Sequence, residues 1–283
     1  SCENVLIENC RFQTGDDCIA IKSGRNEDGR LWNIPSENII VRHCTMADGH
    51  GGVVIGSEIS GGCRNVFVED CEMDSPNLDR VLRLKTNTCR GGVTENIYMR
   101  NVRVGQCREA VMRINLEYEP NEPAKRGFIP TVRNVYMENV TCQKSKYGIL
   151  INGLHESDNI YNINVKNCRF DGVQSEAVKR TGKSHDLHFE QLFVNGQLVL
   201  LDTPGLHKAV GPLGRLLNGM ARASSAGTDI LCVVFDAAHE PQLEDEGWMA
   251  RVAKECPEKC VFALNKCDRA PFYETMFRDL WKE

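Results

Sequence analysis

The sequence of 283 residues lacks several features that define common function classes. It has no apolar run long enough to span a bilayer and no basic-then-apolar leader, so we expect no membrane association. The net charge of -5 shows no excess of basic residues, which argues against nucleic acid as a partner. The 14 cysteines include no CxxC pair, so zinc ribbons and fingers are excluded and no metal site is expected.

The chain begins at Ser1, where a repeat is already under way, and we interpret it as an N-terminally truncated fragment. Its length suits one large domain or two ordinary ones. With 41% hydrophobic and 26% charged residues, the composition is that of an ordinary globular protein.

Internal repetition is the strongest signal in the sequence. One motif, an Asn followed by alternating apolar and polar residues and then Cys or Val, recurs every 24 to 38 residues. It starts at Asn4, Asn38, Asn65, Asn96, Asn134 and Asn162, and in a weaker form at Asp186. A second apolar run follows most copies: CIAIKSG, GVVIGSE, VLRLKT, AVMRINL, GILING and EAVKR. The period of two within these runs predicts strands, and two or more short strands per repeat predict a mainly β fold, a parallel β-helix over residues 1–197.

Two columns of side chains should run along such a helix, because each coil stacks on the next at roughly 4.8 Å. The leading asparagines are predicted to form a ladder of side-chain amides. One inward column is predicted to contain Cys10, Cys44, Cys71, Val102, Val140 and Cys168. We interpret these cysteines as small buried residues rather than as metal ligands or reactive thiols.

Three polar stretches carry residue types that a solenoid core does not need: TGDDCIAIKSG, DGHGGVVIGSE and DRVLRLKT. When their strands are aligned, the inward positions are Ile21, Ile55 and Leu84. Arg83 and Lys85 then point outward, two coils and roughly 10 Å from Asp16 and Asp17, with His50 one coil from the aspartates. Each of these groups alone is more typical of a turn or a solvated face. Their order and their convergence on one groove favour a functional site.

These stretches resemble the polygalacturonase family of glycoside hydrolases, family 28. Gly15-Asp16-Asp17, Gly49-His50-Gly51 and Arg83-Leu84-Lys85 match three of the four signature segments of that family, in the same order. The resemblance covers about residues 1–197 and implies a right-handed parallel β-helix. It implies a glycoside hydrolase that cleaves α-1,4-galacturonosyl linkages of polygalacturonate or pectin oligosaccharides and needs no cofactor. The form GHGGVVIGSE looks more like bacterial, often exo-acting, members.

The resemblance also implies an inverting mechanism with a role for each residue. Asp16 would be the general acid, with a pKa raised by neighbouring carboxylates, and Asp17 would help to activate water. His50 would tune the protonation of the acid, while Arg83 and Lys85 would bind the galacturonate carboxylate. The remaining signature segment of the family, an Asn-Thr-Asp that lies upstream of Gly-Asp-Asp, is absent from this sequence. We therefore expect impaired activation of water.

The pattern changes after Gln197. Apolar runs LVLLD, ILCVVFDA and CVFALNKCD alternate with helix-like stretches, which predicts a partial α/β segment over residues 198–283. The run from Asp202 to Gly205 resembles the DxxG switch of GTPases, and the run from Asn265 to Asp268 resembles their NKxD motif. Together they look most like the Era family of ribosome-assembly GTPases.

By that second resemblance, Asp202 would approach Mg²⁺ and Gly205 would sense the γ-phosphate of GTP, whereas Asn265, Lys266 and Asp268 would recognise guanine. No GxxxxGK[ST] phosphate loop occurs in the sequence, so nucleotide binding should be weak or nil. We therefore rank a polygalacturonase-like hydrolase first. The alternatives are a GTP-binding Era-like protein with the solenoid as a platform, and an inactive chimeric junction of two fragments. The hydrolase would be secreted or periplasmic and the GTPase cytoplasmic, so the compartment stays open.

Overall fold

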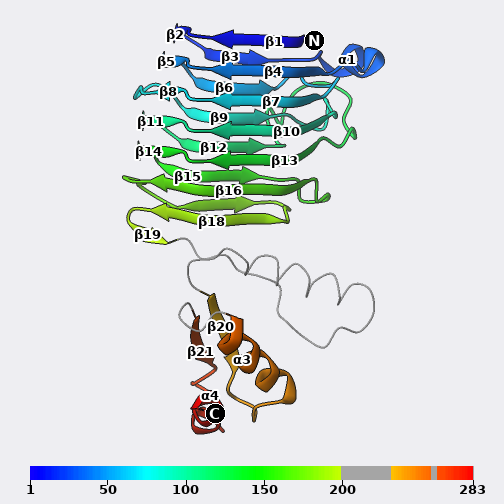
Figure 1. The fold of residues 1–283 in the computed structure, drawn as a ribbon. Helices are drawn as coiled ribbons and strands as arrows, with labels where there is room; N and C mark the ends of the chain where they lie inside the picture. The colour runs from blue at the N-terminus through cyan, green and yellow to red at the C-terminus, as the bar shows by residue number, and fades with distance from the viewer. Residues whose placement is uncertain (199–230, 256–259, 283) are drawn as a thin grey trace. The chain divides into compact units, whose positions relative to one another are not determined.

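The computed structural model describes residues 1–198, 231–255 and 260–282 (Figure 1). The chain divides into two compact units, residues 1–201 and 202–283, which we treat separately. Among the described residues, no helix combines the length and the apolar character needed to cross a membrane.

The first unit is a parallel β-helix, as predicted, and its coils stack one on another from β1 to β18 (Figure 1). Sheet A contains two rows of strands. The long row is β1 (Glu3–Glu8), β4 (Ser36–Arg42), β7 (Cys63–Glu69), β10 (Val93–Arg100), β13 (Thr131–Glu138), β16 (Ile160–Phe170) and β18 (Leu187–Val194). The short row is β2 (Arg11–Gln13), β5 (Thr45–Asp48), β8 (Glu72–Met73), β11 (Arg103–Gln106) and β14 (Thr141–Lys144). The leading asparagines lie in the long row.

Sheet B is built from the second set of apolar runs. Its strands are β3 (Asp17–Ile21), β6 (Gly51–Gly56), β9 (Arg80–Lys85), β12 (Ala110–Asn115), β15 (Tyr147–Asn152) and β17 (Val178–Thr181), all parallel and in coil order. A short helix, α1 (Asn26–Trp32), leaves the first coil, and β19 (Gln197–Leu198) turns back antiparallel to β18. The repeat pattern predicts neither the helix nor the reversal.

The predicted inward column is confirmed for five of its six members. Cys44, Cys71, Val102, Val140 and Cys168 are all at most 1% exposed. The prediction is wrong for Cys10, which is exposed. Cys10 lies between β1 and β2, which pair with β4 and β5 of the next coil.

The buried cysteines behave as small apolar residues. The thiols of Cys71 and Cys168 each lie within 3.9 Å of a carbonyl of the preceding coil, a distance at which a thiol donates a weak hydrogen bond. Burial raises the pKa of Cys71 to about 11 and that of Cys168 to about 12, so both stay protonated at neutral pH. All the cysteines of the predicted inward column are free thiols, which agrees with a structural role.

The amide ladder is confirmed, and its backbone explains the choice of Asn. Asn96 donates from Nδ2 to Oδ1 of Asn65 at 3.1 Å and accepts from Asn134 at 3.0 Å. All six leading asparagines have φ between 56° and 58°, in the left-handed region. Asn tolerates this region better than other residues with a side chain, because its short amide can bond locally. Each of these positions therefore requires a residue that adopts the left-handed backbone conformation and that carries a side-chain amide.

Replacing Asn96 with Ala should lower the free energy of unfolding by about 2–3 kcal/mol, because the variant loses two ladder hydrogen bonds and strains a left-handed residue. Urea unfolding followed by circular dichroism measures this loss. Asn96→Gly is the matched control, since glycine keeps the conformation and loses only the amide. Equal losses for both variants would contradict a conformational role for Asn96.

The second unit contains β20 (Leu231–Asp236) and β21 (Cys260–Asn265), which pair in parallel, with α3 (Leu243–Glu255) between them in sequence and α4 (Glu274–Lys282) after them. Phe235, Met249 and Phe277 form its small core. The helices therefore pack their apolar residues against the strands.

Candidate active site

The outer face of sheet B carries the residues predicted for the site. Ile21, Ile55 and Leu84 are in register and buried, as the strand alignment predicted. Alternation along β9 consequently turns Arg83 and Lys85 outward, where their side chains are 13% and 10% exposed. The two cations thus lie on the sheet face but are largely covered.

Asp16 and His50 come together from neighbouring coils. The backbone amide of His50 donates to the carbonyl oxygen of Asp16 at 2.9 Å. The Nδ1 atom of His50 lies 3.5 Å from Oδ1 of Asp16, and the Asp16 side chain is 87% exposed. The predicted equivalence of these two positions is confirmed by the register, in which Asp17 pairs with Gly51.

The glycines on either side of His50 permit this approach. Gly49 has a φ of +153°, and a Cβ there would lie 2.8 Å from the carbonyl oxygen of Asp16. A Cβ on Gly51 would lie 3.1 Å from Oδ1 of Asp17. A real Cβ atom does not tolerate such a contact with a backbone carbonyl, so Gly49 is required to bring His50 beside Asp16, whereas the contacts at Gly51 are with side chains.

Asp17 forms ion pairs with two of the cations of β9, Lys85 and Arg83. Its Oδ2 atom lies 2.9 Å from Nζ of Lys85, and its Oδ1 atom lies 3.6 Å from Nη1 of Arg83. The predicted separation of roughly 10 Å counted only the spacing of two coils, which the long side chains of Lys85 and Arg83 bridge. The Asp17 side chain is 8% exposed, and its Oδ1 accepts no hydrogen bond from any described residue.

The expectation of a raised pKa at Asp16 is wrong for the free protein. The backbone amide of Asp17 donates to Oδ1 of Asp16 at 2.8 Å and lowers the pKa of Asp16, slight burial opposes this, and His50 and Lys85 lower it further. The neighbouring carboxylate of Asp17 does not raise it because Lys85 and Arg83 neutralise that charge. Asp16 is therefore ionised in the free site.

Sequence analysis missed Tyr118, which follows β12. Its ring centroid lies 5.5 Å from Cζ of Arg83 and 5.2 Å from Nζ of Lys85, within the range of cation–π attraction. A tyrosine in a loop carries no signal of such a contact, because it depends on how the loop folds back over sheet B.

A buried ion pair anchors the loop that carries Tyr118. Arg90 is fully buried and donates from Nη1 to Oε1 of Glu122 at 2.5 Å. Asn87 donates to Oε2 of Glu122 and to the carbonyl oxygen of Tyr118, at 3.0 and 2.8 Å. Burial works against the charge of Glu122, but the hydrogen bonds from Arg90, Asn87 and Arg25 outweigh it and hold its pKa well below the usual range.

The nucleotide-binding predictions concern the second unit. Asp202 and Gly205 lie outside the described residues. Asn265 ends β21 and is in register with Asp236, the last residue of β20. Lys266 forms an ion pair with Asp236, and Asp268 lies in the turn that follows. Across the part of the chain that the structure describes, no three His, Cys, Asp or Glu residues are grouped as metal ligands would be.

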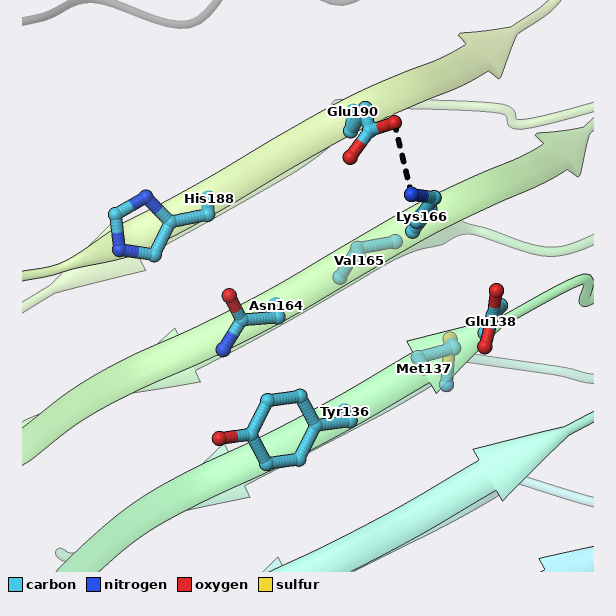
Figure 2. A pocket seen from close by; sticks show the side chains of 8 residues that line it. All are labelled: Tyr136, Met137, Glu138, Asn164, Val165, Lys166, His188 and Glu190. Atoms are coloured by element: carbon cyan, nitrogen blue, oxygen red, sulfur yellow. Dashed lines mark ion pairs between the residues drawn. The ribbon is translucent and has the colours of Figure 1, made fainter. Parts of the chain in front are cut away.

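A shallow pocket lies elsewhere, on the outer face of sheet A (Figure 2). Two side-chain columns border it, one of Tyr136, Asn164 and His188 and one of Glu138, Lys166 and Glu190. Lys166 pairs with Glu190 at 3.0 Å. These are ordinary outward positions of sheet A, and none belongs to the three polar stretches, so we place the candidate site on sheet B.

Comparison with known proteins gives matches to two kinds of protein. The family model of "Glycosyl hydrolases family 28" matches residues 1–185. A probable polygalacturonase of Vitis vinifera is 38% identical over 103 residues, which is 36% of this chain and 21% of that protein. The crystal structure of a hyperthermoactive exopolygalacturonase from Thermotoga maritima is similar with a TM-score of 0.64 and 39% identity, over 69% of this chain and 43% of that one.

The GTPase Era of Deinococcus deserti is 38% identical over 76 residues, which is 27% of this chain and 24% of that protein. The matched parts of this chain therefore span about a fifth to a quarter of these two curated relatives.

Proposed function

Because this chain belongs to the glycosyl hydrolases of family 28, we propose that its first unit is a polygalacturonase-like hydrolase. Its substrates would be polygalacturonate or pectin oligosaccharides, cut at α-1,4-galacturonosyl linkages. The observation that carries the proposal is the meeting of Asp16 and His50 with Asp17, Lys85 and Arg83 on the outer face of sheet B. The names of the polygalacturonase relatives support this substrate class.

The mechanism divides between the two aspartates. Asp16 is exposed on the face and would donate a proton to the leaving oxygen, while Asp17 would orient and deprotonate the attacking water. A carboxylate oxygen that is buried without a donor is costly, so Oδ1 of Asp17 is suited to accept a hydrogen bond from that water. The reaction needs an acid, a base and water, and no cofactor.

Substrate binding would also prepare Asp16 for its role. A galacturonate carboxylate that reaches Lys85 and Arg83 competes with Asp17 for the same two cations. The negative charge near Asp16 then rises, and like charges disfavour its ionised form. The pKa of Asp16 would therefore increase from its lowered value in the free protein when substrate binds, which supplies the protonated acid where it is needed.

Replacing Lys85 with Met should weaken the binding of trigalacturonate by about 10–100-fold, because a charge-assisted hydrogen bond to the sugar carboxylate is lost. Isothermal titration calorimetry measures the dissociation constant without requiring turnover. Lys166→Met is the matched control, since Lys166 also pairs with a carboxylate but lies on sheet A. Equal affinities of wild type and Lys85→Met would count against the proposed site.

Nucleotide binding by residues 198–283 is the second candidate function, and the likeness to GTPase Era favours it. In the described part of this segment, Asp236 and Asn265 end two parallel strands side by side, the position at which α/β sheets bind ligands. GTP and Mg²⁺ would be the ligands under this alternative. Titration with fluorescent GDP tests it, and saturable micromolar binding would favour it.

A further inference from the structure

The basic surface of sheet B continues one coil beyond Arg83. Arg113 of β12 is in register with Arg83, and Asn115 is in register with Lys85. One coil further, Asn152 of β15 follows Asn115 in the same column. Successive coils are separated by roughly 4.8 Å, so the guanidinium of Arg113 is the next cation along the outer face.

Cations outnumber carboxylates in this part of the face. The partly buried cations are Arg80, Arg83, Lys85 and Arg113, and the partly buried carboxylates are Asp17, Asp79 and Glu109. Arg80 pairs with both Asp79 and Glu109, and Asp17 is engaged by Arg83 and Lys85.

Arg113 is the cation with the weakest pairing. Its closest carboxylate contact, from Nε to Oε2 of Glu109, is 3.9 Å long, and Glu109 is also bonded by Arg80. Its Nη1 atom donates to the neutral amide oxygen of Asn152. The side chain is nevertheless only 14% exposed. A desolvated guanidinium beside other guanidiniums costs free energy, which an anion bound there would offset.

The electrostatic environment of Arg113 and Arg83 also favours a bound anion. Burial lowers the pKa of Arg113, Glu109 opposes this, and Arg80 and Arg83 lower the pKa further. Burial and Arg80 likewise lower the pKa of Arg83. Like charges are therefore held close together on a covered face, an arrangement that is found where a protein binds anions.

We propose that Arg113 forms a second carboxylate-binding position on sheet B, one coil beyond the Arg83–Lys85 pair. Its ligand is the carboxylate of the neighbouring galacturonate unit of the bound oligomer. The planar guanidinium can bind this carboxylate through two parallel hydrogen bonds. Asn115 lies in the adjacent column, in register with Lys85, where its amide can bond a sugar hydroxyl group. The inference rests on the proposed function and extends it from one bound uronate to a series.

Oligomers of different length separate this position from the first one. Calorimetric titration with galacturonate, digalacturonate and trigalacturonate gives the affinity added by each sugar. In wild type, affinity should rise with length and fall as salt is added. Arg113→Met should reduce the affinity for digalacturonate and longer oligomers by about tenfold and leave that for galacturonate itself nearly unchanged. Arg113→Lys should restore part of the loss, since the charge remains but the planar fork does not.

The controls distinguish the possible failures. Arg103→Met alters an arginine of the same coil that pairs with Glu72 on sheet A, and it should leave all affinities unchanged. Thermal unfolding of each variant shows that the β-helix is intact; a variant that unfolds is replaced by Arg113→Lys as the test. Wild type that binds no oligomer would overturn both the proposed function and this inference. Length-dependent binding that Arg113→Met leaves intact would overturn this inference alone.

Discussion

Replacing Asp16 with Asn is expected to slow the release of reducing ends from polygalacturonate by about 10²–10⁴-fold, the usual contribution of a general acid. The amide has nearly the same shape and can still accept from the backbone amide of Asp17, so the loop should keep its conformation. It cannot supply the proton that the leaving oxygen requires. Binding of trigalacturonate should therefore change far less than turnover.

Asp171→Asn is the matched control for this prediction. Asp171 is an exposed carboxylate that pairs with Arg169, and its replacement should leave the rate unchanged. A rate for Asp16→Asn within a few-fold of wild type would show that Asp16 is not the acid. A large loss of trigalacturonate affinity in the same variant would instead assign Asp16 to binding.

Replacing Glu122 with Gln should lower the free energy of unfolding by about 3 kcal/mol, because the buried Arg90 then loses its closest counter-charge and keeps only the longer ion pair with the more exposed Glu119. Arg90 is fully buried and the Glu122 side chain is 5% exposed, so water cannot replace the lost partner. The urea midpoint of the β-helix measures the change. Glu72→Gln is the matched control: Glu72 pairs with Arg103, but both side chains are more than half exposed, and no loss is expected.

The pH dependence of this stability follows from the lowered pKa of Glu122. A carboxylate with a depressed pKa in the folded state adds stability above its unfolded pKa of about 4.3 and loses it as the pH falls below that value. The deficit of Glu122→Gln should accordingly be largest near neutral pH and shrink in acid. A deficit that does not depend on pH would contradict an ionic anchor.

The repeat pattern is sufficient to predict the β-helix and the strand alignment that turns Arg83 and Lys85 outward. Period-two alternation fixes which face a residue occupies, and the coil spacing fixes its neighbours, so Ile55 and Cys71 could be placed from sequence alone. The same reasoning was wrong for Cys10, which is exposed.

The contacts of the candidate site were harder to predict than its backbone positions. The ion pairs of Asp17 depend on rotamers of long side chains that bridge two coils. The lowered pKa of Asp16 depends on one backbone hydrogen bond, and the position of Tyr118 depends on the buried Arg90–Glu122 pair. The ion pairs and the position of Tyr118 arise from residues far apart in sequence, whereas the hydrogen bond of Asp16 depends on the rotamer of its own side chain; no local pattern encodes either.

The most direct test of the proposed function is proton NMR of the products that the chain forms from trigalacturonate. Two carboxylates that act as acid and base on opposite sides of the sugar invert the anomeric centre, so the α linkage should first yield the β anomer. We expect this product for wild type and none above background for Asp16→Asn. Initial formation of the α anomer, or equal product from both proteins, would contradict it.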